Sequence, residues 1–281
     1  MEHEMNCEDI EKYTRYLFLE EHSARTIDKY AHDLKSFYTA LSTPKIVQKE
    51  QVLSWKTSLQ SSGYAISTIN SMLAAVNGFF RFMSWDECCV KPLKQQRKIF
   101  RDKSRELSVD EYKRLLHAAK QKNQQRLMLV METLCATGIR VSELQYISVE
   151  AVYCGKAVVN CKKKSRTVFL PSKLCRKLSS YCRVMGIERG TVFVSRSGRP
   201  LNRSNIWNDM KKLCHAACVE ANKVFPHNLR HLFARVFYGL DKDIAKLADV
   251  LGHSSIETTR IYIMESGAEH EKMISRMGLV T

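Results

Sequence analysis

A late stretch of the chain, residues 226–264, concentrates side chains that could act on an anion. It carries His227, Arg230, His253 and Tyr262. Imidazole and guanidinium groups beside a helix N-terminus are suited to binding a phosphate, and a phenol next to them can serve as a nucleophile. Each of these residues alone is more often a packing or surface residue. Because all of them gather in one segment, the pattern favours a site for phosphate chemistry.

The same stretch is expected to fold into short helices that bring these groups together. Pro226 is typical of the first turn of a helix, which would place His227 and Arg230 on one face near its positive end. Gly252 is typical of the residue that ends a helix, here one that begins near Asp243.

A third helix would carry the phenol. Ser254, with Glu257 three residues later, predicts a capping box at the start of a helix that contains Tyr262. The three helices would then direct their polar groups toward one common point.

These motifs resemble those of the tyrosine recombinase (phage integrase) family. The resemblance rests on HNLRH, LGHSS and TTRIY, together with ATGIRVSEL at residues 136–144, and it covers nearly the whole chain in order and spacing. Asn228 stands where the family usually has an acid, and Leu232 where it usually has a threonine. Neither position bears the reaction in the family, so these departures concern the support of the site and not its chemistry.

Arg140 lies in the upstream motif, next to an apolar, leucine-rich segment from which residues 139–144 are expected to begin another helix. A cation in such surroundings is costly unless it is paired with an anion. Glu143, three residues later, could simply be that partner. The resemblance implies instead that Arg140 grips the scissile phosphate and that Glu143 supports the site.

A β-hairpin is expected from two strand-like runs, residues 157–161 and 166–170, with a short lysine-rich connection. Lysines at a hairpin tip are normally solvated, but the resemblance implies a catalytic lysine here. The family pattern Gly-Lys-Gly-Asn-Lys-x-Arg is one residue short in this chain. If Cys161 takes the place of the first glycine, Lys162 is the catalytic candidate and Lys164 the alternative.

The resemblance therefore implies breakage and rejoining of DNA through a phosphotyrosine, without metal, ATP or cofactor. It implies these catalytic residues: Arg140, Lys162, His227, Arg230, His253 and Tyr262. The two arginines would neutralise the phosphate, His227 would take or share the tyrosine proton, and His253 would bond the same phosphate. Lys162 would protonate the departing 5′-oxygen, and Tyr262 would become joined to the 3′-phosphate. Two other functions remain open, a DNA-binding regulator that does not cut and a type IB topoisomerase-like enzyme that relaxes DNA.

The distribution of charge favours a polyanionic partner such as double-stranded DNA. The whole chain carries a net charge of +16. Residues 1–90 hold 9 Lys and Arg against 12 Asp and Glu, a net of −3, which leaves 36 against 17, or +19, for residues 91–281. The ten cysteines lack the spacing of a zinc site and are expected to be reduced thiols. Without an apolar run long enough to span a bilayer, and with a polar N-terminal sequence, we expect a cytoplasmic, nucleoid-associated protein rather than a membrane protein.

The expected fold is mainly α with a small β-hairpin. Residues 1–90 show apolar stripes at helical spacing and predict a four-helix bundle, which resembles the SAM-like core-binding domain of the family. Residues 91–105 are a basic interdomain linker. The resemblance implies that residues 106–281 are the α+β catalytic domain. In it, residues 191–195 are expected to form a short strand, and residues 205–219 are expected to be helical with Trp207 facing inward.

Eleven further cations are candidates for DNA contact, although solvated surface charge is an equal alternative for the loop arginines. They are Arg25, Lys29, Lys56, Arg81, Lys94, Arg97, Lys98, Arg101, Lys164, Arg199 and Arg203. The C-terminal tail should form a short helix with Met273, Ile274 and Met277 on one side. The resemblance implies that this tail packs into a neighbouring subunit and that four subunits act on two DNA sites.

Overall fold

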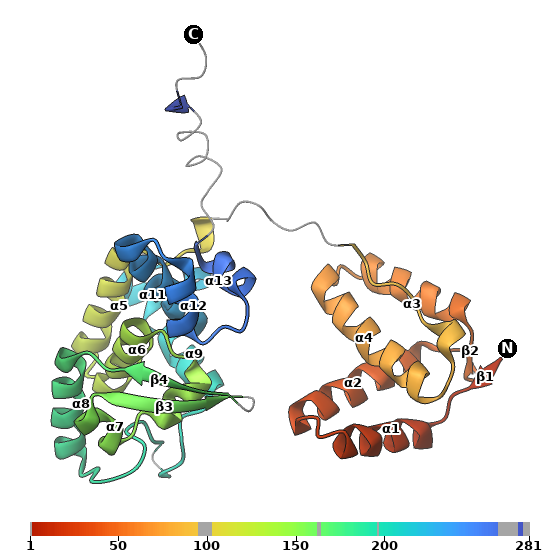
Figure 1. Ribbon diagram of the computed structural model, residues 1–281, viewed down its shortest axis with the longest axis horizontal. Coiled ribbons are helices and arrows are strands. Elements are labelled where there is room, and N and C mark those ends of the chain that lie inside the picture. Colours follow the sequence, from red (N-terminus) through yellow and green to blue (C-terminus); the bar gives the residue numbers. More distant parts are fainter. Residues whose placement is uncertain (1, 95–102, 162–163, 196, 264–274, 278–281) are drawn as a thin grey trace. The chain divides into compact units, whose positions relative to one another are not determined.

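The computed structural model describes residues 2–94, 103–161, 164–195, 197–263 and 275–277. The chain divides into two compact units, Met1–Arg97 and Lys98–Thr281 (Figure 1). Both are mainly helical and each contains one small antiparallel two-stranded sheet, so the predicted fold class is confirmed. Within the described residues, none of the helices is long and apolar enough to cross a membrane.

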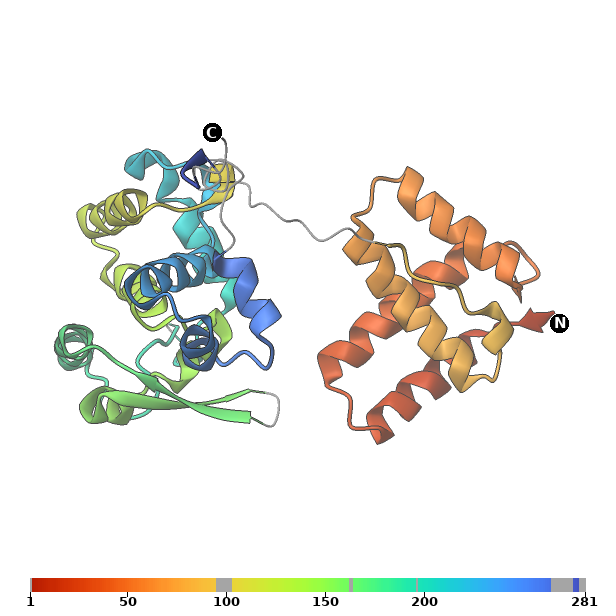
Figure 2. The same ribbon diagram turned by 45° about the horizontal axis from the view of Figure 1, so that its top comes forward.

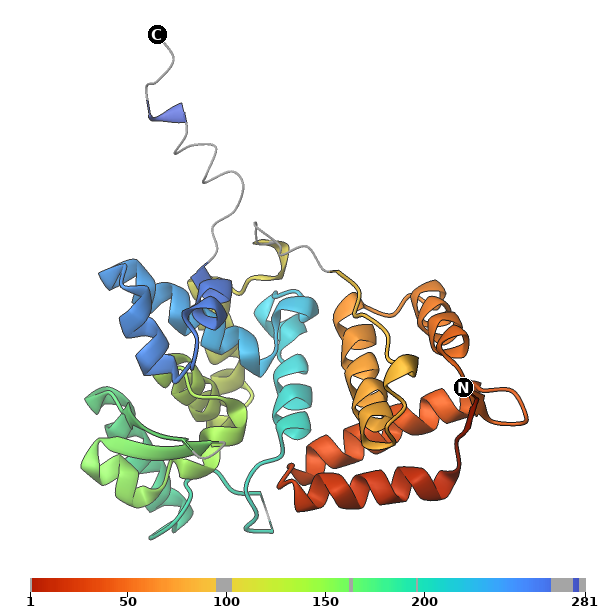
Figure 3. The ribbon, with the colours of Figure 1, turned by 45° about the vertical axis from the view of Figure 1, so that its right-hand side comes forward.

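The N-terminal unit is the predicted four-helix bundle. Its elements are β1 (His3–Glu4), α1 (Cys7–Leu19), α2 (Ala24–Ala40), β2 (Ile46–Val47), α3 (Lys49–Ser61), α4 (Ile66–Phe82) and the 3-10 helix η1 (Asp86–Cys88). α4 crosses α1 and α2 (Figure 3). Ser23 caps α2, since its Oγ accepts from the backbone N–H of Thr26 at 3.2 Å. Trp55 and Trp85 are buried in the core of this unit.

The second unit consists of short helices and one β-hairpin. Its elements are η2 (Lys103–Arg105), α5 (Val109–Gln121), α6 (Gln125–Thr137), η3 (Val141–Tyr146), α7 (Val149–Cys154), β3 (Lys156–Cys161), β4 (Lys164–Phe169), α8 (Ser172–Met185), α9 (Arg203–Lys211), α10 (Cys214–Ala217), η4 (Ala221–Lys223), α11 (Pro226–Asp241), α12 (Ile244–Leu251) and α13 (Ile256–Ile263). Ser108 and Glu111 form a capping box at the start of α5. α11 packs against α6 and α13, which places the C-terminal motifs beside the upstream motif.

The hairpin β3–β4 extends from the helices as a two-stranded ribbon (Figure 2). Its register pairs Cys161 with Lys164, so only two residues connect the strands. The predicted connection of four residues, 162–165, was too long because the ladder continues to the tip. Lys162 itself lies outside the described residues.

Four local predictions about the second unit were wrong. The helix expected from residue 139 is a 3-10 helix that begins at Val141. The strand expected at residues 191–195 is represented only by isolated bridges, one of them between Ser148 and Thr191. The helix expected over residues 205–219 is divided into α9 and α10. Trp207 is 43% exposed, because Ile206 and Met210, four residues apart, form the inward face of α9.

Candidate active site

α11, α12 and α13 supply four of the predicted groups. Pro226 occupies the first turn of α11, as expected. Gly252 ends α12 with a φ of +66°, in the left-handed conformation that the sequence predicted. The cap of α13 differs from the prediction, since Ser255 rather than Ser254 accepts from the backbone N–H of Glu257, at 3.2 Å. The helix starts one residue later than expected and still carries Tyr262.

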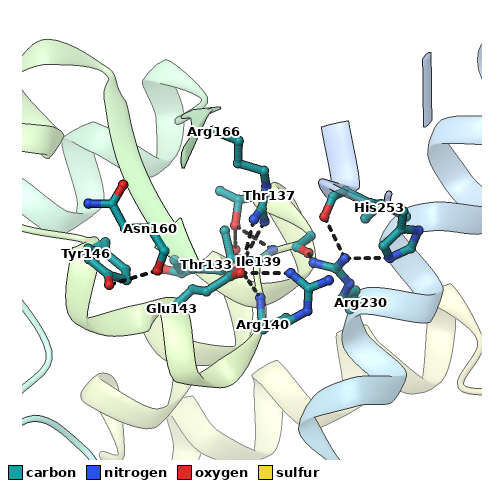
Figure 4. A network of polar contacts seen from close by, with 12 residues as sticks. Thr133, Thr137, Ile139, Arg140, Glu143, Tyr146, Asn160, Arg166, Arg230 and His253 are labelled. Atoms are coloured by element: carbon teal, nitrogen blue, oxygen red, sulfur yellow. Dashed lines mark hydrogen bonds and ion pairs between the residues drawn. The ribbon is translucent and has the colours of Figure 1, made fainter. Parts of the chain in front are cut away.

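Arg230 is the most completely buried cation of the site, with 1% of its surface exposed. Its Nη1 donates to the carbonyl of Gly138 at 2.5 Å, and its Nη2 donates to the carbonyl of Leu251 at 2.8 Å. Nη2 also lies 2.9 Å from Nε2 of His253. Backbone carbonyls from two distant segments therefore fix the plane of this guanidinium (Figure 4).

His253 is held between Arg230 and Thr259. Because a guanidinium can only donate, Nε2 of His253 accepts, and Nδ1 carries the proton that is donated to Oγ1 of Thr259 at 2.8 Å. Burial lowers the pKa of His253 to about 4, and the nearby arginines Arg230, Arg140 and Arg166 act in the same direction. His253 is therefore neutral near pH 7.

Tyr262 lies among three imidazoles and is 6% exposed. Its hydroxyl is 3.4 Å from Nε2 of His227, and its ring stacks on His231 at 4.3 Å between centroids. His253 lies 5.3 Å from the same ring. His231 was missed by the sequence analysis. It immediately follows Arg230 in HNLRH, and its helical position one turn beyond His227 was the available signal.

A second cluster holds Arg140 through a buried carboxylate. Glu143 is 2% exposed and binds Nη1 of Arg140 at 2.9 Å and the backbone N–H of Arg140 at 2.8 Å. Arg166 binds the same carboxylate in bidentate fashion, at 3.0 and 2.9 Å (Figure 4). Burial would raise the pKa of Glu143, but the hydrogen bonds from Arg166 and Arg140 bring it below its usual range. Glu143 is thus the partner of Arg140, and the same carboxylate also binds Arg166 of the hairpin.

Arg166 is the second residue that the sequence analysis missed. It stands at the arginine of the family pattern Gly-Lys-Gly-Asn-Lys-x-Arg, and that position was the signal. Its side chain also packs closely against Gly252, since a Cβ added to Gly252 would lie 2.5 Å from Cδ of Arg166. Arg166 therefore connects the hairpin to Arg140 and to the turn that carries His253.

The two clusters meet at Arg230. Burial lowers the pKa of Arg230, and the charge of Arg140 lowers it further, whereas the hydroxyl of Tyr262 acts in the opposite direction. Arg140, whose side chain is 35% exposed, and Tyr262 both lie close enough to influence the Arg230 guanidinium. Two arginines with a phenol beside them suit the transfer of a phosphoryl group.

The remaining candidate residues differ in their exposure and in their contacts. Arg25, Arg81, Lys94, Arg199 and Arg203 are exposed. Lys29 pairs with the buried Asp33, and Lys56 donates to the carbonyl of Lys91 at 2.8 Å, so both also serve the fold. Lys164 begins β4. The candidates outside the described residues are Lys162, Arg97, Lys98, Arg101, Met273 and Ile274.

The helical unit brings together a tyrosine, two arginines and three histidines, a set of groups suited to phosphoryl transfer. Residues 105–269 match the Phage integrase family, and residues 10–87 match the Phage integrase, N-terminal SAM-like domain. The chain belongs to the tyrosine recombinase (phage integrase) family.

Named relatives agree with this assignment, and solved structures share the fold. The chain is 28% identical to tyrosine recombinase XerA of Pyrococcus furiosus, over 98% of this chain and 96% of the relative. It is 30% identical to tyrosine recombinase XerC of Roseiflexus castenholzii, over 91% and 88%. A lambda integrase tetramer bound to a Holliday junction shares the fold, with a TM-score of 0.74 and 18% identity over 92% of this chain and 77% of that one. The XerH site-specific recombinase bound to its difH substrate does so with a TM-score of 0.69 and 20% identity, over 96% and 84%.

Proposed function

We propose that this site-specific recombinase cuts and rejoins double-stranded DNA through a covalent bond between Tyr262 and a 3′-phosphate. The proposal rests mainly on the placement of the Tyr262 hydroxyl, 3.4 Å from Nε2 of His227 and within the influence of Arg230. A nucleophile, a base and a fixed cation thus meet at one point.

In the proposed reaction, the Tyr262 oxygen attacks phosphorus and the bond to the 5′-oxygen breaks. A phenol has an ordinary pKa of about 10, so it needs a base to lose its proton near neutral pH. His227 accepts that proton, and Arg140 and Arg230 neutralise the charge that builds on the non-bridging oxygens. The departing 5′-oxygen takes a proton from a hairpin lysine, Lys162 or alternatively Lys164.

The contacts of His253 support a role other than the direct phosphate contact expected from the sequence. Both ring nitrogens are engaged, one with Arg230 and one with Thr259. We therefore propose that neutral His253 positions Arg230 against the phosphate, instead of only bonding the phosphate itself. Since one phosphodiester replaces another, the reaction needs no ATP, metal or cofactor to supply energy or a nucleophile.

DNA binding is proposed to involve both units. Residues 106–281 would hold the scissile phosphate, residues 1–90 would grip the duplex, and the basic residues 91–105 would cross the backbone between them. Exposed Arg25, Arg81 and Lys94 are the best placed of the N-terminal candidates. By analogy with the lambda integrase tetramer, four chains would act on two sites, with the C-terminal tail exchanged between them in a nucleoid-associated, cytoplasmic complex.

The experiment that tests the reaction is covalent trapping. Inverted repeats found beside the gene are supplied as duplex DNA, and adducts are resolved on denaturing gels. Wild type and Tyr238→Phe should form the adduct, while Tyr262→Phe should bind the same DNA and form none; Tyr238 is the control because it is another tyrosine of the same region. An adduct that persists in Tyr262→Phe would reject Tyr262 as the nucleophile.

The alternatives give different results in the same assay. A regulator that only binds DNA would yield no adduct with wild type. A topoisomerase-like enzyme would relax supercoiled plasmid that lacks the repeats, whereas a recombinase requires them.

A further inference from the structure

A pocket beside the candidate active site contains an aromatic residue that the proposed chemistry does not use. It has a volume of about 400 Å³ and is lined by Arg203, Ser204, Trp207, Phe225, Pro226 and His227. The first three lie in the N-terminal part of α9, and the others at the start of α11. The volume is within the usual range for pockets that bind small organic groups.

Trp207 is the unusual member of this set. The chain has three tryptophans. Trp55 and Trp85 are 6% and 8% exposed, whereas Trp207 is 43% exposed. Nζ of Lys211 lies 5.4 Å from the centre of the Trp207 ring. A large, partly exposed indole with a cation beside it is suited to contact with another flat or apolar group.

The surroundings of the indole favour a ligand that carries a phosphate. Arg203 is exposed at the first turn of α9, and none of the six lining residues bears a carboxylate. The N-termini of α9 and α11 both reach the pocket, and each adds partial positive charge. An aromatic surface beside cations is the combination with which proteins bind nucleotides of a separated strand.

The pocket is also continuous with the reacting groups. His227 lines it, and Nε2 of the same side chain is 3.4 Å from the hydroxyl of Tyr262. A DNA strand whose phosphorus lies at Tyr262 would therefore place a neighbouring nucleotide at the pocket.

We propose that this pocket receives one nucleotide adjoining the scissile phosphate, with its base against Trp207 and its phosphate toward Arg203. This inference rests on the proposed function, because it takes the scissile phosphate to lie at Tyr262. The contact holds the strand in line with the nucleophile. It also accommodates a base that leaves the helical stack when strands exchange.

The first test measures Trp207 fluorescence with a random-sequence duplex at low salt. DNA should quench the wild-type emission, and the quenching should be largely lost in Trp207→Phe, which retains only the buried Trp55 and Trp85. Equal quenching in the two proteins would reject a DNA contact at Trp207. Because non-specific binding requires no cleavage, this result is independent of the proposed reaction.

The second test uses adduct formation on a duplex that wild type cleaves, with an abasic residue at one or the other nucleotide flanking the scissile phosphate. Trp207→Ala should form the adduct about tenfold more slowly on intact DNA, since stacking on one base contributes on that scale. Trp207→Phe should stay close to wild type. The matched control is Tyr153→Ala, an aromatic on α7 that is 79% exposed and does not line the pocket.

The abasic duplexes separate stacking from a merely structural role. At one of the two positions, loss of the base should slow wild type about as much as Trp207→Ala does, and the two proteins should then react at the same rate. If Trp207→Ala is slower by the same factor on intact and on both abasic duplexes, the proposed nucleotide contact is wrong. Failure of wild type to form any adduct would instead overturn the proposed function, while the fluorescence result would stand.

Discussion

The two halves of the candidate site are held together by different forces. Arg230 is fixed by the backbone carbonyls of Gly138 and Leu251 and by His253. Arg140 is fixed by the carboxylate of Glu143, which depends in turn on Arg166 from the hairpin. The first half rests on neutral acceptors, one of which is the carbonyl of Gly138 in the upstream motif, whereas the second is an ion-pair network that includes the hairpin. We therefore expect the halves to respond differently to mutation and to pH.

The largest difference should appear when each arginine is replaced by lysine. Arg230→Lys loses the planar guanidinium that donates to the carbonyls of Gly138 and Leu251, so the rate of cleavage should fall by about 100- to 1000-fold. Unfolding in urea should show a loss of about 2–4 kcal/mol, because buried carbonyls lose their donors. Arg140→Lys should lower cleavage by a similar factor, but the free energy of unfolding should change by less than about 1 kcal/mol, since Glu143 keeps Arg166.

Trapping of the covalent adduct and urea unfolding of both variants measure these effects. If Arg140→Lys destabilises the protein as much as Arg230→Lys, the two arginines are not held in different ways.

Glu143→Gln should break the ion-pair half alone. Removing the charge leaves Arg166, whose side chain is 14% exposed, without its anion, and a cost of about 2–4 kcal/mol is expected. Adduct formation should slow because Arg140 loses its orientation. The matched control is Glu132→Gln, which breaks the more exposed pair between Glu132 and Lys177 and should cost about 1 kcal/mol or less. A Glu143→Gln protein as stable as this control would show that the network does not stabilise the site.

Gly252→Ala should disturb the contact between the two halves, where Arg166 packs against the turn at Gly252. The substitution meets two costs, a φ of +66° and a Cβ within 2.5 Å of Arg166 Cδ. Gly190→Ala meets only the first, since φ there is +76° and nothing lies within 4 Å. Backbone strain should cost each variant about 1–2 kcal/mol, and Gly252→Ala should be less stable by a further amount and slower in cleavage. Thermal unfolding of the pair isolates the contact with Arg166, and equal melting temperatures would argue against it.

The difference between the halves also explains what the sequence could reveal. The groups of α11 to α13 lie within residues 226–264, so helix periodicity, Pro226 and Gly252 were enough to predict their convergence. The sequence did not predict that Arg166 of the hairpin pairs with Glu143, nor that the carbonyl of Gly138, 92 residues away, holds Arg230. The register of the hairpin likewise depends on the hydrogen-bonded pairing of its strands. Trp207 faces outward because Ile206 and Met210 form the buried face of α9. Local signals predicted the elements, while tertiary contacts determined the supports.

The smallest expected effect is a difference in how the contributions of the two halves to stability depend on pH. Burial holds the pKa of His253 at about 4, below its ordinary value of about 6.5, so the unfolded chain binds more protons between these values. The stability due to neutral His253 is complete above about pH 6.5 and is lost as pH falls toward 4. After allowance for solvent, the loss should be about 1–2 kcal/mol. Glu143, whose pKa is also lowered, keeps its contribution until pH falls below the ordinary carboxyl value of about 4.3.

Urea unfolding between pH 7 and pH 4.5 therefore reports mainly on the half that contains His253. His253→Asn should flatten the decline across this range, because the titrating group is gone, whereas Glu143→Gln should leave its slope unchanged. Since His253 holds Arg230 through Nε2, cleavage should decline over the same range as protonation removes that acceptor. A decline that survives in His253→Asn would mean that another imidazole, His227 or His231, controls the acid response of the site.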